Sequence, residues 1–196
     1  MNLAVLDHGM GNLRSVAKAF EAAGAHVVIT SEIDEFRRAD ALCVPGQGVF
    51  GRCMRNLEAR RQRDAVIEWI ESEKPFFGIC LGMQILFDSS EEQGPIDGLG
   101  LIPGRVTKLQ GAVRVPHIGW NTLAPSDGDQ APTRYFYFDH SYAVHPADDS
   151  IVTAWCEHGQ RFAAWIATGS VMAVQFHPEK SGDKGLKLLK EWVTAT

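Results

Sequence analysis

The feature that most constrains the fold is a regular alternation of short apolar runs and helical segments in the first half of the chain. Apolar runs with the length of β-strands occupy residues 3–6, 27–30, 41–44 and 76–79. Helical periodicity occupies residues 13–23, 53–71 and 81–87, and a very polar stretch at residues 60–63 can interrupt the second of these helices. Short strands that alternate with helices are typical of a parallel sheet covered on both faces.

The second half of the chain has a different pattern. Residues 99–176 contain short β-prone runs separated by Gly, Pro and Asp, and residues 171–176 form the strongest of these runs. Residues 125–132 have the composition of an exposed loop, and residues 184–193 have that of a closing helix. We predict one α/β domain over residues 1–196. It has a central, mostly parallel sheet flanked by helices, with additional antiparallel strands in the second half.

Composition narrows the classes of function. The net charge is −5 over 196 residues, which argues against a nucleic-acid-binding protein with a basic face. No apolar run approaches the roughly 20 residues of a membrane helix, and the N-terminal segment lacks the features of a signal peptide. The four cysteines share no CxxC spacing, which favours a reducing compartment over a disulfide framework. We expect a cytoplasmic protein with no membrane contact, no metal and no cofactor.

The segment GICLGMQ at residues 78–84 has the pattern of a nucleophile elbow. An apolar strand leads into Gly78, Cys80 and Gly82, and a helix follows. In such a turn the two glycines make room beside a strained residue, and the helix N-terminus favours the thiolate form of cysteine. The alternative is that Cys80 is a small buried apolar residue, like the other three cysteines. The strand–turn–helix context favours a nucleophile.

A cysteine nucleophile requires a base, and His177 is the best supported of the seven histidines. It ends an apolar strand, and Pro178 favours an extended conformation for it. In an extended segment, Glu179 faces the same side and can orient the imidazole. The alternative is a surface strand end with two polar residues, and no zinc-ligand spacing competes with either interpretation.

The turn at residues 45–48, with sequence PGQG, follows the third predicted strand. Its glycines permit positive φ angles and close backbone approach, so it can supply an N–H group to an oxyanion. A plain Pro-Gly turn is the simpler alternative.

Taken together, these segments resemble the class I glutamine amidotransferases. GICLGMQ and the HPE tripeptide at residues 177–179 are similar to the nucleophile and acid–base signatures of that family. Over nearly its whole length, the chain resembles the histidine-biosynthesis branch of that family, which is the glutaminase subunits of imidazole glycerol phosphate synthase. The segments that carry this resemblance are DHGMGNLRSV at 7–16, PGQG at 45–48, GLGLIPGRV at 98–106, PHIGWN at 116–121, YFYFDHSY at 135–142 and QFHPEKS at 175–181.

The resemblance implies roles for individual residues. It implies a catalytic triad of Cys80, His177 and Glu179. Further positions are implied in three groups: an oxyanion hole from Gly46, Gln47, Gly48 and the backbone of Leu81; glutamine binding by Gly48, Gln84, Glu92, Ser141 and Tyr142; and a partner interface with Asn12, Trp120, Tyr137 and Lys180. It also implies that Gly46, Gln47 and Gly48 complete the oxyanion hole only after a backbone rearrangement. The implied partner is a cyclase subunit with a (β/α)₈ barrel, which forms a heterodimer with this chain and uses the ammonia released from glutamine.

Two positions depart from the family pattern, and several alternatives stay open. His8 stands where tyrosine is more frequent, and Gln47 stands where valine is usual. Without the resemblance, Gln84 is an exposed helix residue, Trp120 and Tyr137 are ordinary core aromatics, and Lys180 is a solvated charge. The competing functions are a related glutaminase that serves anthranilate- or aminodeoxychorismate-type enzymes, a paralogue that supplies ammonia for sugar amidation, a non-catalytic subunit and a cysteine peptidase.

Overall fold

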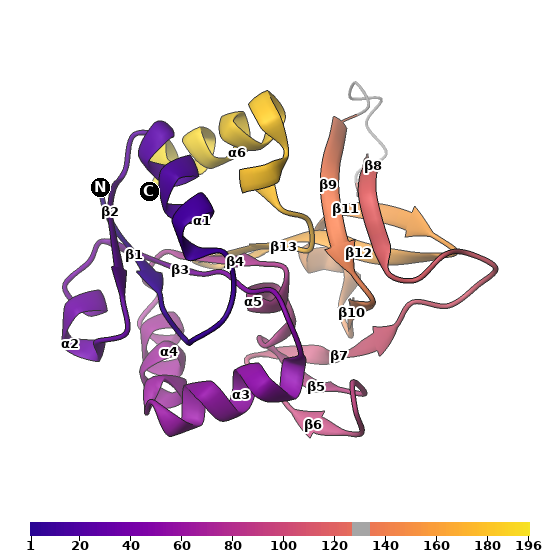
Figure 1. Cartoon of the computed structure of the whole chain (residues 1–196), viewed down its shortest axis with the longest axis horizontal. Helices are drawn as coiled ribbons and strands as arrows, with labels where there is room; N and C mark the ends of the chain where they lie inside the picture. Colours follow the sequence, from indigo (N-terminus) through magenta and orange to yellow (C-terminus); the bar gives the residue numbers. More distant parts are fainter. Residues whose placement is uncertain (127–133) are drawn as a thin grey trace.

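The fold is built on one large twisted sheet (Figure 1). It is described from a computed structural model, for residues 1–126 and 134–196. Among these residues, the strands follow the order β2-β1-β3-β4-β13-β12-β10-β7-β5-β6. Strand β11 also pairs with β12, β8 pairs with β11, and β9 pairs with β8. The strands are β1 (Asn2–Leu6), β2 (His26–Thr30), β3 (Ala41–Val44), β4 (Phe76–Ile79), β5 (Phe87–Ser90), β6 (Ile96–Asp97), β7 (Ile102–Lys108), β8 (His117–Pro125), β9 (Arg134–His140), β10 (Tyr142–Pro146), β11 (Val152–His158), β12 (Gln160–Thr168) and β13 (Val171–Val174).

Helices cover both faces of the parallel part of the sheet. In Figure 1, α1 and α6 lie together on one face, while α3 and α4 lie on the other. The helices are α1 (Leu13–Ala22), α2 (Ile33–Phe36), α3 (Phe50–Ala59), α4 (Gln62–Glu71), α5 (Leu81–Gln84) and α6 (Gly182–Ala195), with the 3₁₀ turns η1 (Asp149–Ile151) and η2 (Pro178–Lys180). Among the described residues, no helix combines the length and the apolar character needed to cross a membrane.

Alternation along the strands divides the interior into two cores. Leu3 and Val5 point toward α1 and α6, whereas Ala4 and Leu6 point toward the opposite helices. On the first side, the rings of Phe20, Phe77 and Trp192 meet edge to face with centroids 5.1 to 5.7 Å apart. Burial on both faces is the reason that the central strands β3 and β4 are continuously apolar.

The predicted fold class is confirmed. Strands β2, β1, β3, β4 and β13 are mutually parallel, and β12, β10 and β7 continue the sheet in antiparallel pairs. The parallel strands therefore all end at one edge of the sheet. That edge carries the segments after β1, β3, β4 and β13, in which the predicted catalytic residues and the predicted oxyanion turn lie.

Several predicted boundaries were wrong. The helix expected to start at residue 53 starts at Phe50. The interruption expected at residues 60–63 is confirmed, because Arg61 adopts a left-handed conformation (φ 58°) between α3 and α4. The helix expected at residues 81–87 ends at Gln84, because Phe87 pairs with Ile102 as the start of β5. Strand β13 ends at Val174 rather than at residue 176. The loop expected at residues 125–132 falls largely outside the described residues, and Pro125 itself belongs to β8.

Candidate active site

Cys80 occupies a strained turn between β4 and α5. Its φ of 53° and ψ of −104° lie outside the regions that a cysteine ordinarily adopts. The turn is held by backbone hydrogen bonds from Cys80 N to Val174 O (2.7 Å) and from Met83 N to Cys80 O (3.0 Å). The strained residue stands between a strand and a helix, as the elbow pattern predicts.

The two glycines beside Cys80 allow the turn to pack against its neighbours. A Cβ atom on Gly82 would lie 1.8 Å from the carbonyl oxygen of Val44, and one on Gly78 would lie 2.7 Å from the carbonyl oxygen of Gly82. Both distances are far below contact, and both obstacles are backbone atoms. The expected reason for the glycines, close packing around the elbow, is therefore confirmed.

His177 and Glu179 form a buried pair next to the elbow. Their side chains are only 1% and 2% exposed, and His177 Nδ1 lies 2.8 Å from Glu179 Oε1. Burial lowers the pKa of His177, but the neighbouring Cys80 and Glu179 raise it, and the net effect raises the pKa to about 10. Among the described residues, His177 Nε2 has no hydrogen-bond partner. The raised pKa favours the imidazolium form, and the second ring nitrogen is not engaged by another described side chain.

The pairing of these two side chains was predicted, but the backbone reason was only half correct. His177 is extended (φ −105°, ψ 95°), as expected before a proline. Residues Pro178–Lys180, however, form the 3₁₀ turn η2 instead of continuing the strand. The turn brings Glu179 back toward the imidazole.

A small cavity opens beside Cys80. It has a volume of about 160 Å³. Besides Cys80 and Leu81, all five residues predicted to bind glutamine line it. Its full lining is Gly48, Cys80, Leu81, Gln84, Glu92, Pro116, Asp139, His140, Ser141 and Tyr142. Burial, and to a lesser extent the neighbouring Glu92 and Glu91, raises the pKa of Tyr142.

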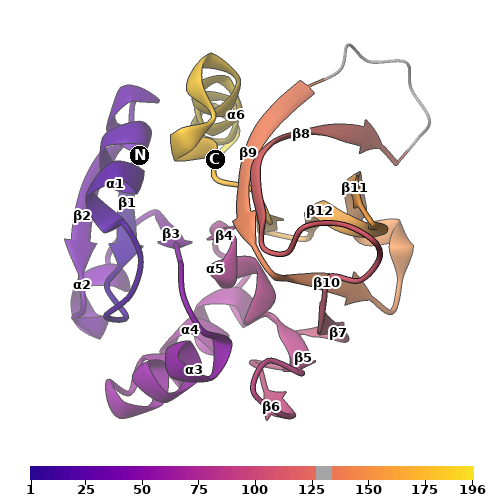
Figure 2. The same ribbon diagram turned by 45° about the vertical axis from the view of Figure 1, so that its right-hand side comes forward.

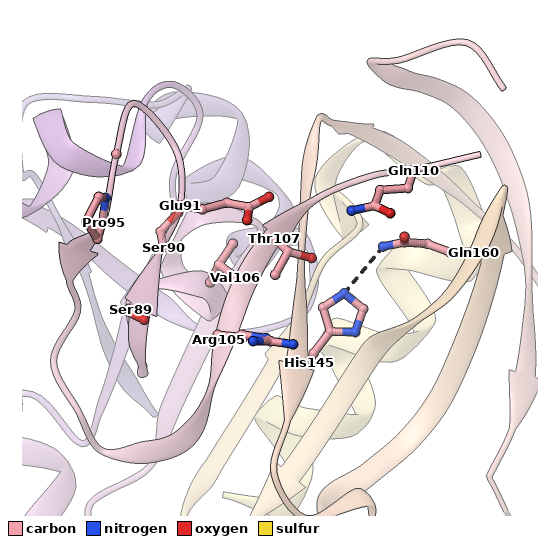
Figure 3. Close-up of a pocket in the computed structure, with 11 residues that line it drawn as sticks. Ser89, Ser90, Glu91, Pro95, Arg105, Val106, Thr107, Gln110, His145 and Gln160 are labelled. Atoms are coloured by element: carbon pink, nitrogen blue, oxygen red, sulfur yellow. Dashed lines mark hydrogen bonds between the residues drawn. The ribbon is translucent and has the colours of Figure 1, made fainter. Parts of the chain in front are cut away.

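A wider hollow of about 450 Å³ lies elsewhere, between β5, β7, β10 and β12 (Figure 3). Arg105, His145 and Gln160 project into it, and Gln160 Nε2 lies 3.3 Å from His145 Nε2. None of the predicted site residues is among the described residues that line it. The strained Cys80 lines the smaller cavity and not this hollow, so the chemistry of the lining, rather than volume, selects the candidate site.

The turn at residues 45–48 lies against the elbow, and the carbonyl oxygen of Gly46 faces Leu81. The N–H of Leu81 donates to the carbonyl oxygen of Gly46 over 3.4 Å. A Cβ on Gly46 would lie 2.6 Å from the Cβ of Leu81, so only glycine fits this approach. In this arrangement one predicted oxyanion donor is already bonded to the turn that carries the others.

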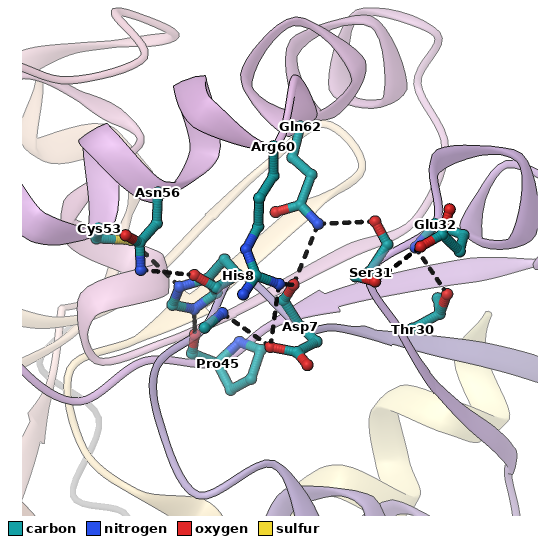
Figure 4. Close-up of polar contacts among 11 residues, drawn as sticks. Asp7, His8, Thr30, Ser31, Glu32, Pro45, Cys53, Asn56, Arg60 and Gln62 are labelled. Carbon is teal, nitrogen blue, oxygen red and sulfur yellow. Dashed lines mark hydrogen bonds and ion pairs between the residues drawn. The ribbon is translucent and has the colours of Figure 1, made fainter.

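Both departures from the family pattern make contacts that hold this turn. His8 Nε2 lies 2.6 Å from the carbonyl oxygen of Pro45, which can only accept, so Nε2 carries the proton (Figure 4). Burial lowers the pKa of His8, and its neutral Nδ1 faces Cys53 Sγ at 3.6 Å. On the other side, Gln47 Nε2 donates to Asp139 Oδ2 over 3.2 Å. His8 and Gln47 therefore anchor both ends of the turn.

Three of the four predicted interface residues gather on one surface, outside the core. Trp120 is 56% exposed, and its ring meets the ring of Tyr137 at 6.2 Å. The Nζ atom of Lys180 lies 5.5 Å above the Tyr137 ring and 3.6 Å from Asp139. The fourth, Asn12, is exposed and caps α1, which packs against η2. The alternative of ordinary core aromatics is therefore wrong for Trp120.

The sequence model of the family described as glutamine amidotransferase class-I matches residues 4–195. This chain belongs to that family. Its class I glutamine amidotransferase fold also appears in solved structures of low identity. A crystal structure of a glutamine amidotransferase covers 98% of both chains with a TM-score of 0.76 at 20% identity. The structure of PurLQS from Thermotoga maritima covers 99% of this chain and 98% of its own, with a TM-score of 0.75 at 18% identity.

Relatives of higher identity carry the name imidazole glycerol phosphate synthase. The imidazole glycerol phosphate synthase subunit HisH of Aquifex aeolicus is 44% identical over 98% of this chain and 96% of its own. The subunit of the same name from Methanothermobacter thermautotrophicus is 44% identical over 97% of both chains. The chloroplastic imidazole glycerol phosphate synthase hisHF of Arabidopsis thaliana is 41% identical over 97% of this chain, which spans 34% of that protein.

The structure also shows residues at the amidotransferase site that the sequence analysis did not single out. His140, Pro116 and Asp139 line the cavity, and Gln175 donates a hydrogen bond to Cys80 Sγ over 3.4 Å. Gln175 could have been found, because it lies two residues before His177 at the end of the apolar run predicted as a strand, where residues two apart are expected to face the same side. His140 belongs to the segment 135–142 that carried the family resemblance, but no local pattern distinguished it.

Proposed function

We propose that this amidotransferase hydrolyses L-glutamine with a triad of Cys80, His177 and Glu179. We further propose that it supplies the ammonia to a cyclase subunit, for imidazole glycerol phosphate and aminoimidazole carboxamide ribotide formation in histidine biosynthesis. The observation that carries the proposal is a strained cysteine that opens into a small polar cavity beside a buried imidazole–carboxylate pair. The shared name of the relatives supports the pathway.

The proposed reaction has two stages. The Cys80 sulfur attacks the carboxamide carbon of glutamine, and the carbonyl oxygen becomes an oxyanion. When the C–N bond breaks, His177 gives its proton to the leaving nitrogen, and ammonia departs from a γ-glutamyl thioester. His177 then takes a proton from water, the hydroxide attacks the thioester, and glutamate and the Cys80 thiolate are released. Glu179 holds the imidazole and stabilises its charged form.

Substrate selection follows from the cavity. A volume of about 160 Å³ suits a small amino acid. The carboxyl groups of Glu92 and Asp139 line the cavity, which suits an α-ammonium group. We assign Gly48, Gln84, Glu92, Ser141 and Tyr142 to glutamine binding, since all five line this cavity together with Cys80.

The oxyanion hole requires the turn at residues 45–48 to change conformation. Rotation of the peptide between Gly46 and Gln47 would withdraw the Gly46 carbonyl from Leu81 N–H and point Gln47 N–H toward the elbow. Leu81, Gln47 and Gly48 could then donate to the oxyanion, which is worth about 10²–10³ in rate for a single donor. While the turn at residues 45–48 keeps its present conformation, the oxyanion hole is incomplete. We therefore expect low glutaminase activity in the absence of a partner.

The partner surface is proposed from exposed aromatic and apolar side chains on the β8–β9 hairpin. Ile118, Trp120 and Tyr135 are 59%, 56% and 53% exposed. Aromatic residues of this kind are enriched at protein interfaces. The word subunit in the relatives' names supports a second chain. We propose that this chain is a (β/α)₈ cyclase, which forms a heterodimer through a surface that includes Asn12, Trp120, Tyr137 and Lys180.

We propose that the whole chain acts as one domain and works in the cytoplasm.

The test is glutamate release from glutamine by the purified chain, with and without a candidate cyclase and its nucleotide ligand. Activity that appears with the cyclase and disappears in Cys80→Ala is expected. Cys156→Ala, which removes another buried thiol, is the matched control and should retain activity. Cys80-dependent activity that ignores the cyclase would reject the proposed acceptor, and the absence of Cys80-dependent activity would reject the glutaminase.

A further inference from the structure

Gln175 is a fully buried amide in direct contact with the proposed nucleophile. It follows β13, is 0% exposed, and its backbone N–H donates to Ala164 O over 2.9 Å. Its Nε2 donates to Cys80 Sγ over 3.4 Å, and its Oε1 accepts from Gln84 Nε2 over 3.1 Å. Both ends of the amide are therefore bonded, one of them to sulfur.

The direction of these hydrogen bonds is fixed by a backbone carbonyl. Gln84 Nε2 also lies 2.8 Å from the carbonyl oxygen of Tyr142, which can only accept. The nitrogen of Gln84 must therefore point at both Tyr142 and Gln175, so Gln175 presents its oxygen to Gln84. Its NH₂ group is then the end that faces Cys80. A reversed Gln175 amide would place two donors against each other and an oxygen against sulfur.

The Tyr142 carbonyl is itself held by an ordered chain of neutral histidines. Asn121 Oδ1 accepts from Thr122 N (2.7 Å), so Asn121 Nδ2 is the atom that donates to His117 Nε2 (3.1 Å). His117 then donates through Nδ1 to His140 Nε2 (3.0 Å), and His140 donates through Nδ1 to Tyr142 O (2.9 Å). Burial lowers the pKa of His117 to about 4 and that of His140 to about 3, so both rings stay neutral and keep this direction.

We propose that Gln175 is a positioning residue that stabilises Cys80 as a thiolate and aims it at the carbon that it attacks. An N–H donor bonds a charged acceptor more strongly than a neutral one, so this contact favours the thiolate. The other end of the Gln175 amide is bonded to Gln84, which lines the cavity. Gln175 thereby connects a cavity side chain to the nucleophile. This inference rests on the proposed glutaminase function, because it assigns a task to a residue of that site.

The test is the pH dependence of Cys80 alkylation by iodoacetamide in the full chain, with the modified residue identified by mass spectrometry. Gln175→Met keeps a similar volume and removes the donor. The expected result is a rate of Cys80 alkylation at pH 7 that falls about tenfold or more, with its midpoint moved to higher pH. With the cyclase present, kcat for glutamine should fall while KM changes little.

Two further variants keep the test decisive. Gln160→Met, at an amide that bonds His145 away from the cavity, should alkylate like the original chain. If Gln175→Met fails to fold, the near-isosteric Gln175→Glu places an oxygen against sulfur and should shift the midpoint in the same direction. Unchanged alkylation in a folded Gln175 variant would overturn the inference even if Cys80-dependent glutaminase activity is present. Loss of that activity in the original chain would overturn the proposed function, while the alkylation profile would still decide the effect of Gln175 on the thiolate.

Discussion

Glu179 Oε1 lies 2.8 Å from His177 Nδ1, and the two side chains share an environment closed to solvent. A buried carboxylate beside an imidazole stabilises the imidazolium form. The backbone strengthens this arrangement, since His177 N donates to Tyr137 O and Ser181 Oγ donates to His177 O. The proposed acid–base residue is thus fixed at its ring and at its main chain.

The first prediction concerns the protonation of His177. Glu179→Gln removes the carboxylate charge, so the pKa of His177 should fall from about 10, and the glutaminase rate should fall by about 10²–10⁴. The folded pKa lies above the ordinary value of 6.5. The pair therefore stabilises the fold fully below pH 6.5, and this stabilisation is lost as the pH rises through about 10. NMR titration of the His177 ring and urea unfolding between pH 6 and 10 measure both effects.

Glu58→Gln, at an exposed carboxylate on α3, is the control and should leave the His177 titration unchanged. A His177 ring that titrates near pH 6.5 in the original chain would contradict the account of the buried pair.

The second prediction concerns Gln47. Gln47→Val restores the residue that is usual in the family and removes the hydrogen bond to Asp139. The turn at residues 45–48 should then rearrange more easily, and glutamate release by the chain without a partner should rise by about two- to tenfold. Asp139→Ala removes the same bond from the other side. The double variant should gain little over either single variant, and fully additive gains would mean that the bond does not restrain the turn.

The third prediction concerns the proposed partner surface. Trp120→Ala should weaken cyclase binding by about 2 kcal/mol or more, which is about thirtyfold in Kd. Ile29→Ala is the control, because Ile29 is 39% exposed on β2, at the opposite side of the molecule from β8 and β9 (Figure 2). Isothermal titration calorimetry measures both affinities. Equal weakening by the two variants, or no weakening by Trp120→Ala, would reject this surface.

Local pattern was sufficient to predict most of the parallel half of the fold. Alternation of strand and helix predicted β1, β3 and β4, and the glycines around Cys80 predicted the elbow, because these features depend on neighbours in sequence. The end of α5 could not be predicted. Residue Phe87 leaves the helix to pair with Ile102, and that pairing is a tertiary contact.

The site was predictable where its chemistry lies within one short segment. Cys80 and the pair of His177 with Glu179 could be identified in this way. The bond between Gln47 and Asp139 joins residues 92 positions apart, so no local pattern indicates it. The direction of the Gln175 amide likewise depends on the Tyr142 carbonyl, which comes from a separate strand.

Covalent labelling by an electrophilic glutamine analogue at pH 8 decides whether Cys80 is the nucleophile. Burial raises the pKa of Cys53 and that of Cys156 to about 12, and raises the pKa of Cys43 well above 9, so these thiols should stay protonated and unreactive. We predict that the label attaches to Cys80 alone and that excess glutamine prevents the labelling. A label on another cysteine, or labelling of Cys80 that glutamine does not slow, would contradict the assignment of Cys80 as the glutamine-attacking nucleophile.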